Sequence, residues 1–371
     1  MLLTLFALIL HVAAGGSVNA ALDQARQAYA STGETTTIYI APGDYEEELT
    51  IDVPGLRLIN ASPTPDIEVR DGGVHISPNA VRLTWYYGHG YQYASMGERF
   101  NYGGKRERRW NASTLVTAPG FYAENIIFQN SFNLYVSAAE AQDSLVDISQ
   151  AKTDWTPNER PKRIMPNRPK NAGNTDVQTR FYRERASALS FTSEAKNCLL
   201  RNCRVTGRQD AFYGDHGASV TVHGGVLAGA VDYIFGGLTL VVREAQLVGM
   251  ISAEHNDACY IAAGRAATPD NLAKLPKESR DSVPEDEIVQ HGMVFVDCTV
   301  RHATTDELVH PGSKPIYLAR PWRWWGATTF TNVQADDGVL SEQLWSLGLT
   351  KGHPAPFVHA TRHDNDTTTT R

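Results

Sequence analysis

The segment Glu124-Asn125-Ile126-Ile127-Phe128-Gln129-Asn130 carries the pattern that decides the fold of this chain. Asn or Asp comes first, an aliphatic pair and a polar residue follow, and Asn or Asp then returns. The pattern recurs as Lys196-Asn197-Cys198-Leu199-Leu200-Arg201-Asn202 and, more loosely, as Phe295-Val296-Asp297-Cys298-Thr299-Val300. Such a degenerate repeat is typical of a parallel β-helix, in which equivalent strands of successive coils stack on one another. Asn and Asp at the corners tolerate a left-handed backbone and can bond to neighbouring corners.

Short runs of strand-forming residues make up most of the chain after about residue 35. Gly, Asn, Asp and Pro separate these runs, and no helical period of useful length appears before the C-terminal region. The runs are residues 37–40, 49–53, 56–59, 81–85, 220–222, 238–242, 293–296 and 328–330. The pattern alone favours a parallel β-helix and leaves a β-sandwich or barrel open.

Composition limits the class of protein. The chain has 371 residues, of which 42% are hydrophobic and 20% charged, as in globular proteins. The net charge of -7 argues against nucleic-acid binding. No apolar stretch approaches the 18 or more residues of a membrane span. The four cysteines, Cys198, Cys203, Cys259 and Cys298, fit no zinc spacing and are expected to be buried, with a disulfide left open.

The N-terminus has two interpretations. Residues 1–14 are nearly all apolar and Val18-Asn19-Ala20 has the small-residue form of a signal cleavage site, although a positively charged start is missing. Alternatively, residues 7–14 form a buried first strand and Ser17 caps a helix from Val18 to about Tyr29. Residues 1–20 are therefore either a signal peptide or the first strand of the fold.

Two aspartates sit in short aromatic and aliphatic motifs, and an arginine motif follows them. The motifs are Gly207-Arg208-Gln209-Asp210-Ala211-Phe212-Tyr213, Val231-Asp232-Tyr233-Ile234-Phe235-Gly236-Gly237 and Tyr317-Leu318-Ala319-Arg320-Pro321-Trp322. Carboxylates in such surroundings are costly to ionise. We therefore expect acid/base or nucleophilic chemistry at Asp210 and Asp232.

The spacing of the two aspartates also points to a pair. Asp210 and Asp232 are 22 residues apart, roughly one coil of a β-helix, so they can occupy stacked equivalent positions. Repulsion between two close carboxylates keeps one protonated while the other stays ionised, especially beside a cation. Such a pair supplies a proton donor and a nucleophile.

Taken in order, the three motifs resemble those of the pectin methylesterase (pectinesterase) family, roughly Gln-Asp-Thr-Leu-Tyr, Asp-Phe-Ile-Phe-Gly and Leu-Gly-Arg-Pro-Trp. Further family-like pieces are Ala41-Pro42-Gly43-Asp44-Tyr45-Glu46-Glu47, Glu184-Arg185-Ala186-Ser187-Ala188-Leu189 and Tyr260-Ile261-Ala262-Ala263-Gly264-Arg265. The matches run from about residue 35 to about residue 335, and the ordered set is specific. The resemblance implies an all-β fold: a single-stranded, right-handed, pectin-lyase-like parallel β-helix with a short N-terminal helix and long loops.

The resemblance also implies catalytic roles. Asp232 would be the nucleophile that attacks the C6 carbonyl of a methyl-esterified galacturonate. Asp210 would be the general acid that protonates the leaving methoxide and then the base that activates water. Gln209 would donate to the oxyanion, and Arg320 would hold Asp232 ionised and oriented.

Further residues are expected to bind the substrate. Trp322, Tyr213 and Phe235 would form the floor and walls for sugar rings, although Tyr213 and Phe235 are as well explained as core side chains. Val231 and Arg185 are expected to contact the substrate too. The resemblance implies no metal and no cofactor.

The sequence departs from the family pattern at three places. Arg185 stands where the family usually has a second Gln that supports the oxyanion, and an unreplaced donor could cost ~10²–10³ in rate. Ala211-Phe212 replaces Thr-Leu after the acid and is expected to reshape the pocket floor. Ala319 replaces the Gly before Arg320, which is a milder change.

Two long segments are expected to be loops that rim the groove of a β-helix domain spanning residues 21–362. Residues 131–183 are rich in Pro, Arg and Lys around residues 155–163, and residues 266–291 are also poor in apolar side chains. The basic loop could contact an anionic polysaccharide, but a solvated loop is favoured. Residues 363–371, with four consecutive Thr, are expected to form a disordered tail.

The leading hypothesis is a pectin methylesterase, an extracellular monomer that acts on methyl-esterified homogalacturonan in cell-wall modification or degradation. Two alternatives are an esterase or thioesterase with a non-pectin substrate and a non-catalytic polysaccharide-binding β-helix. A lyase of similar fold is disfavoured because it would need a calcium-binding carboxylate cluster.

Overall fold

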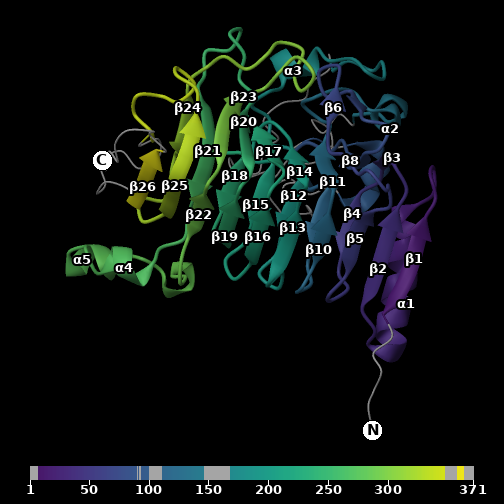
Figure 1. Cartoon of the computed structure of the whole chain (residues 1–371), viewed down its shortest axis with the longest axis horizontal. Helices are drawn as coiled ribbons and strands as arrows, with labels where there is room; N and C mark the ends of the chain where they lie inside the picture. The colour runs from purple at the N-terminus through teal and green to yellow at the C-terminus, as the bar shows by residue number, and fades with distance from the viewer. Residues whose placement is uncertain are drawn as a thin grey trace.

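The computed structural model of this chain describes residues 7–89, 91, 93–99, 111–145, 168–346 and 357–362, and shows a long stack of parallel strands (Figure 1). Seventeen strands form one continuous sheet that folds into two faces, and a seven-stranded sheet forms a third face. The chain passes from face to face and returns one coil further along. The parallel β-helix predicted from the Asn/Asp repeat is confirmed.

The strands of each face succeed one another along the stack. The first face contains β1 (Leu8–Val12), β2 (Thr36–Ile40), β5 (Arg57–Asn60), β10 (Tyr122–Glu124), β13 (Cys198–Arg201), β16 (Ser219–His223), β19 (Thr239–Arg243), β22 (Met293–Val296), β25 (Ala327–Ala335) and β26 (Phe357–Arg362). The second contains β3 (Gly43–Glu46), β8 (Val81–Trp85), β11 (Ile126–Asn130), β14 (Arg204–Thr206), β17 (Val226–Gly229), β20 (Gln246–Gly249), β23 (Thr299–His302) and the end of β25.

The third face carries the predicted motifs. It contains β4 (Leu49–Ile51), β9 (Thr114–Val116), β12 (Leu189–Phe191), β15 (Phe212–Gly214), β18 (Ile234–Gly236), β21 (Cys259–Gly264) and β24 (Ile316–Ala319). Two short strands, β6 (Val69–Arg70) and β7 (His75–Ile76), pair antiparallel outside the stack.

A single left-handed residue turns the chain from the first face to the second. On six coils this corner residue has φ between 47° and 69°, namely Asn125, Asn202, Gly224, Glu244, Asp297 and Asn332. Asn202 Nδ2 donates to Asn125 Oδ1 at 2.6 Å, so neighbouring corners bond as the sequence predicted. The alignment of the repeat was wrong by five residues, however. Strand pairing places Asn125 beside Asn202 rather than Asn197, because Tyr122 pairs with Leu199.

The interior consists of apolar side chains stacked in rows along the axis. In one row of the first face, eight successive residues from β2 to β25 have no measurable exposure, namely Ile38, Leu58, Ala123, Leu200, Val222, Val242, Phe295 and Phe330. The rings of Phe295 and Phe330 stack at 4.3 Å. Burial of each large apolar side chain contributes about 1.5–3 kcal/mol, so these rows fix the register of the coils.

All four cysteines are buried and none forms a disulfide, which confirms the prediction of small buried side chains. Burial raises the pKa of both Cys203 and Cys259 to about 12. The thiols are therefore neutral packing groups.

The N-terminal end of the stack is covered by a helix. Strand β1 pairs with β2, and α1 (Val18–Thr32) begins after Ser17, whose side chain accepts from Ala20 N at 3.1 Å. Glu47 accepts from the backbone N–H of Val18 at 2.7 Å, a favourable place for a carboxylate. The strand is less buried than predicted, since only Val12 is fully buried.

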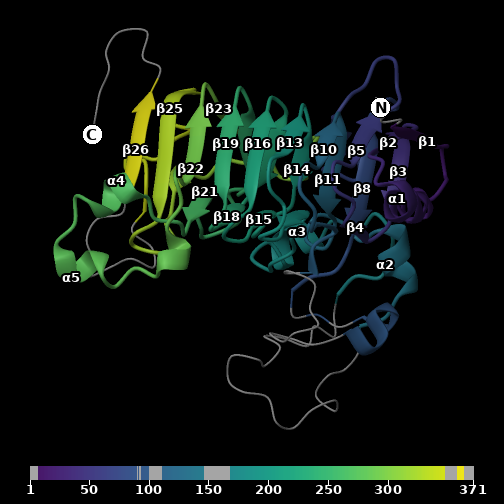
Figure 2. The same ribbon diagram turned by 90° about the horizontal axis from the view of Figure 1, so that it is seen from below.

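The described parts of the two long segments contain short helices and are anchored to the body. Residues 131–183 include α2 (Ala138–Gln142) and α3 (Val177–Arg180), and residues 266–291 include α4 (Pro269–Leu272), α5 (Lys277–Arg280) and η4 (Glu285–Glu287). A further turn, η1 (Ala94–Arg99), precedes them. Figure 2 shows α4 and α5 projecting at the C-terminal end of the stack and α2 near the N-terminal end.

One basic residue of the first segment is not solvated. Arg168 is buried, pairs with Glu140 and lies 3.9 Å from the centre of the Phe132 ring. The basic stretch at residues 155–163 and the predicted tail at residues 363–371 lie outside the described residues. Within the described part of the chain, no helix is long and apolar enough to cross a membrane.

Candidate active site

Asp210 and Asp232 occupy equivalent positions on successive coils of the third face. Each lies two residues before its strand, β15 or β18, and the pairing of Phe212 with Ile234 sets the two aspartates side by side in the stack. Asp210 N donates to Val231 O at 3.2 Å, which ties the two coils at this point. The side chain of Asp210 is 6% exposed and that of Asp232 is 17% exposed. The predicted spacing of one coil is confirmed.

Arg320 holds the carboxylate of Asp232 with two hydrogen bonds. Its Nε donates to Oδ1 at 2.9 Å and its Nη2 donates to Oδ2 at 2.5 Å. Burial raises the pKa of Asp232 above its usual range, while the bonds from Arg320 and the charge of Arg185 act in the opposite direction. The arrangement thus keeps an oriented carboxylate with a strong charge partner in a nearly enclosed place.

The ring of Tyr260 packs against the guanidinium of Arg320, a contact that was not predicted from the sequence. The guanidinium carbon of Arg320 lies 4.0 Å from the centre of the Tyr260 ring, which stacks at 5.3 Å on Tyr317 of the next coil. Arg320 N also donates to Ala262 O at 2.8 Å. The motif Tyr260-Ile261-Ala262-Ala263-Gly264-Arg265 was recognised, but a stack between coils has no signal in sequence.

Arg185 reaches Asp210 on the next coil. Its Nε lies 3.1 Å from Asp210 Oδ2. The sequence predicted contact of Arg185 with a substrate but did not predict this ion pair. Each of the two carboxylates therefore has its own arginine.

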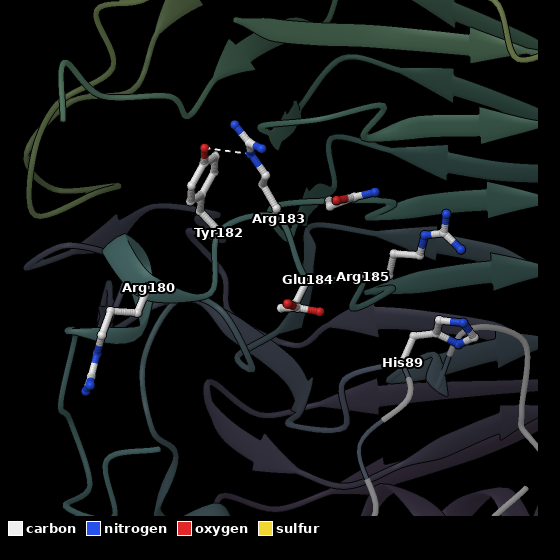
Figure 3. Close-up of a pocket in the computed structure, with 7 residues that line it drawn as sticks. His89, Arg180, Tyr182, Arg183, Glu184 and Arg185 are labelled. Atoms are coloured by element: carbon white, nitrogen blue, oxygen red, sulfur yellow. Dashed lines mark hydrogen bonds between the residues drawn. The ribbon is translucent and has the colours of Figure 1, made fainter. Parts of the chain in front are cut away.

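Gln209 lines a pocket beside the carboxylate pair. Its backbone forms a bridge with Arg185 on one side and Val231 on the other, so three predicted site residues lie in one row across the coils. The pocket has a volume of about 580 Å³ and is lined by His89, Arg180, Tyr182, Arg183, Glu184, Arg185 and Gln209. Figure 3 shows Arg185 beside His89, with Arg180 pointing away from both. The side chain of Val231 packs in the main core.

The three predicted aromatic residues meet on the outer side of the third face. Tyr213 and Phe235 lie at paired positions of β15 and β18 with ring centres 4.6 Å apart, and Trp322 lies 6.0 Å from Phe235. Tyr213 and Phe235 are 7% and 5% exposed, whereas Trp322 is half-buried. Trp322 therefore presents a partly exposed ring that packs near Phe235 and lies close to the guanidinium of Arg323.

The segment 266–291 closes one side of this aromatic cluster. Glu287 bonds to Arg265, and Trp325 Nε1 donates to Glu287 at 2.7 Å. The guanidinium of Arg265 lies 5.2 Å from the centre of the Trp322 ring. The end of the segment is thereby fixed next to Trp322.

The expectation that Ala211-Phe212 reshapes the pocket floor was wrong. Both side chains are 1% exposed and point into the main core, where Phe212 packs 5.4 Å from Phe191. Residues alternate between the two sides of a strand, so the outer neighbour of this pair is Tyr213. Ala319 is also fully buried, and its difference from Gly stays away from the groove.

Among the described residues, no three His, Cys, Asp or Glu side chains gather in a way that could hold a metal ion. The groups near Asp210 and Asp232 include the guanidiniums of Arg185 and Arg320, the amide of Gln209 and the carboxylate of Asp257. The chemistry that these residues can perform is nucleophilic attack and proton transfer by carboxylates.

Comparisons with known proteins agree with this geometry. A family model described as Pectinesterase matches residues 177–347. "Probable pectinesterase/pectinesterase inhibitor 64" of Arabidopsis thaliana is 24% identical over 163 residues, which are 43% of this chain and 24% of that protein. "Probable pectinesterase A" of Aspergillus niger is 22% identical over 326 residues, which are 88% of this chain and 69% of that protein. The match thus spans about a quarter of the Arabidopsis relative.

The similarity to solved structures concerns the fold. The pectin methylesterase from Aspergillus niger in deglycosylated form has a TM-score of 0.55 at 19% identity, covering 97% of this chain and 87% of that one. The shared fold is the right-handed parallel β-helix. Asp210, Asp232 and Arg320 all fall inside residues 177–347, the segment that the Pectinesterase family model matches.

Proposed function

We propose that this protein is a pectin methylesterase, which hydrolyses the methyl esters of polygalacturonate to pectate and methanol. The observation that carries the proposal is Asp232, held by Arg320 through two hydrogen bonds one coil away from Asp210. The family match over residues 177–347 supports the substrate class. The half-buried ring of Trp322, two residues after Arg320 in the chain, supports a sugar polymer as the ligand, because aromatic faces pack well on sugar rings.

In the first step, Asp232 attacks the C6 carbonyl carbon of a methyl-esterified galacturonate. The two bonds from Arg320 orient the carboxylate and keep it ionised, which activates it as a nucleophile. Gln209 donates to the oxygen that becomes negative. The C–O bond to the methoxy group then breaks, and Asp210 gives its proton to the departing methoxide. Methanol and an acyl intermediate on Asp232 result.

In the second step, water replaces the enzyme carboxylate. Asp210, now ionised, takes a proton from a water molecule that attacks the acyl carbon. The bond to Asp232 breaks, and the galacturonic acid that forms keeps the second proton of the water and releases it to solvent as the carboxylate. Asp210 ends protonated and Asp232 ends ionised, so one water is consumed for each methanol released.

We propose that the protein acts outside the cell as a monomer, where its polymer substrate would be found, and that it needs no metal or cofactor. The two carboxylates and two arginines supply all the charge that the reaction requires. Methanol release should therefore be unchanged after treatment with a chelator.

Methanol release from methylated pectin by the wild type, Asp232→Asn and Asp297→Asn tests the proposal. Asn accepts the left-handed backbone that Asp232 and Asp297 share, with φ of 48° and 54°, so both variants should fold. Asp232→Asn removes the nucleophile and should reduce kcat by at least ~10³-fold. Asp297→Asn makes the same change at a corner remote from the site and should retain full activity.

The alternatives predict other results. Activity that survives in Asp232→Asn would contradict the role of Asp232. Hydrolysis of simple aryl esters without action on pectin would indicate an esterase for another substrate. Binding of pectin without turnover by the wild type would indicate a polysaccharide-binding protein.

A further inference from the structure

Arg185 forms an ion pair with the residue that we assign as acid and base. The distance from Arg185 Nε to Asp210 Oδ2 is 3.1 Å, and only 6% of the Asp210 side chain is exposed. The neighbouring carboxylate, Asp232, already has Arg320 as its partner. Each carboxylate of the stacked pair thus has a guanidinium partner, Arg185 from the coil before Asp210 and Arg320 from two coils beyond Asp232.

The backbone of this coil is built so that Arg185 reaches Asp210. The pairing of Leu189 with Phe212 has an offset of 23 residues, whereas Arg185 bridges Gln209 at an offset of 24. The segment from Arg185 to Leu189 therefore has one residue more than the segment opposite it. The extra residue forms a bulge, where Ala211 O accepts hydrogen bonds from both Ala188 N at 2.8 Å and Leu189 N at 3.1 Å. Such a bulge re-aims the side chains that precede it.

The segment before the bulge is fixed on both sides. Ala186 N donates to Gln209 O at 3.2 Å, and His89 N donates to Arg185 O at 2.8 Å. The main chain of Arg185 is therefore held between two other segments of the chain. Its side chain extends from a fixed point towards Asp210 rather than from a free loop.

A guanidinium at this distance favours the ionised form of a carboxylate. The Asp210 carboxylate is nearly enclosed, so water and salt screen the interaction much less than at a surface. The charge of Arg185 also acts on Asp232 in the same direction. Repulsion between the two carboxylates favours protonation of one of them. Arg185 counteracts this effect at both Asp210 and Asp232.

Resting on the proposed function, we propose that Arg185 is a positioning residue that sets the protonation state of Asp210 and thereby the pH range in which the aspartate pair hydrolyses its ester. The first step requires Asp210 protonated and Asp232 ionised, which gives a bell-shaped pH profile. Because Arg185 favours the ionised form of both carboxylates, it moves the whole bell to lower pH. The same pair beside a neutral Gln would work at higher pH.

In the described part of the chain, other charged groups also lie near Asp210 and Asp232, and these groups are unchanged in every variant proposed below. Glu184 and His89 line the same pocket as Arg185, and Asp257 acts on Asp232 while pairing with Arg183 at 2.8 Å. None of these is changed by substitution of Arg185, so they form a constant background.

The kinetic test is the pH profile of kcat/KM for methanol release by the wild type, Arg185→Gln, Arg185→Lys and Arg243→Gln. Arg185→Gln should move the alkaline limb up by ~1–2 pH units, since an arginine beside an aspartate lowers its pKa by about that much. Arg185→Lys keeps the charge and should stay close to the wild type. Arg243, exposed at the end of β19, is the matched control and its substitution should leave the profile unchanged.

A second measurement does not depend on turnover. The side-chain carboxyl carbon of Asp210 is followed by NMR in protein labelled at aspartate, with Asp210→Asn to assign the signal. Asp232→Asn serves as the background, because it leaves one titrating carboxylate in the pair. Adding Arg185→Gln to this background should raise the pKa of Asp210.

The two measurements separate the two proposals. If Arg185→Gln leaves both the alkaline limb and the titration of Asp210 in place, the assignment of Arg185 is overturned. If the titration moves but the wild type releases no methanol from pectin, the assignment of Arg185 stands and the proposed function fails. If the kinetic limb alone moves, Arg185 acts on the substrate and not on Asp210.

Discussion

Asp210 and Asp232 lie one coil apart at the same position of the third face, and both have a left-handed backbone, with φ of 57° and 48°. Asp and Asn adopt this conformation more readily than most residues, so the corner itself favours these residue types. The backbone rather than a flexible side chain brings the carboxylates together. Asn is consequently the substitution that removes the charge with the least strain.

The Arg320 side chain should control both the rate and the acid limb of the pH profile. Burial raises the pKa of Asp232, and Arg320 is the main group that opposes it. Removing the guanidinium in Arg320→Gln should raise that pKa further, so the ionised nucleophile is lost at a higher pH and the acid limb moves up. We expect kcat/KM to fall by ~10²-fold at its optimum, as for loss of one charge-stabilising donor. A profile with an unmoved acid limb would contradict this role, and Arg243→Gln is again the control.

Trp322 should matter for the polymer more than for a small ester. Its ring is half-buried and rests near Phe235 at 6.0 Å, so it can pack on a sugar ring. Trp322→Ala should raise KM for methylated pectin by ~3–10-fold, the size expected from loss of one aromatic packing contact. kcat/KM for a simple aryl ester should change little, and Trp322→Phe should recover part of the affinity. An equal loss on both substrates would indicate a structural defect instead.

Glu307 should make the stability of the protein depend on pH below 4.5. It is buried and accepts hydrogen bonds from Arg301 at 2.6 Å and Arg204 at 3.0 Å. Burial by itself raises the pKa of Glu307, but the bonds and charges of the two arginines outweigh it and bring the pKa to about 2, below the ordinary 4.5. A carboxyl group with a lowered pKa in the folded protein stabilises the fold at pH values above its pKa in the unfolded protein. This contribution is lost as the pH falls through the pKa in the folded protein.

Urea denaturation of Glu307→Gln and the wild type checks this linkage. At pH 7 the substitution should lower the free energy of unfolding by about 3 kcal/mol, because buried Arg204 and half-buried Arg301 lose their charge partner. The difference should shrink as pH falls from 4.5 towards 2. Glu342→Gln, at an exposed position, should show neither effect. A difference that is independent of pH would rule out the ion pairs as its cause.

Two adjacent glycines test the geometry of the corners. A Cβ at Gly225 would lie 2.1 Å from Cys203 O, whereas a Cβ at Gly224 would meet nothing within 4 Å, although both have positive φ. Gly225→Ala should therefore destabilise the protein by at least ~2 kcal/mol. Gly224→Ala should cost about 1 kcal/mol for the backbone alone, and Gly224→Asn less, because Gly224 occupies the corner row of Asn202. Equal costs for the two Ala variants, measured by thermal unfolding, would contradict the packing of this corner.

Much of the architecture could be read from local patterns. The recurring Asn and Asp residues predicted left-handed corners, and the short β-runs predicted stacked strands. The spacing of Asp210 and Asp232 predicted their adjacency because one coil takes nearly the same number of residues wherever no loop is inserted. Trp322 packs with the other two rings, Tyr213 and Phe235 from paired positions of β15 and β18 and Trp322 from the residues that follow β24.

The errors concern features that depend on contacts between distant parts of the chain: which strand positions pair, which side of a strand faces the core, and which charged side chain is buried. The first Asn of each repeat appeared equivalent, but hydrogen bonding between strands matches Asn125 with Asn202. Phe212 was expected at the groove, although the alternation along β15 turns it inward and Tyr213 outward. Arg168 belongs to the segment 131–183, whose basic residues were expected to be solvated, and it is instead buried against Glu140.

The sequence by itself determined the class of fold, the two carboxylates and the arginine that follows them, because coil length, corner residues and short motifs are local properties. Tertiary structure decided which charge meets which carboxylate. Arg185 is 25 residues from Asp210, and Arg320 is 88 residues from Asp232, with loops of unequal length between them. Only the stacking of coils, including the bulge opposite Ala211, places each guanidinium within ion-pairing distance of its partner.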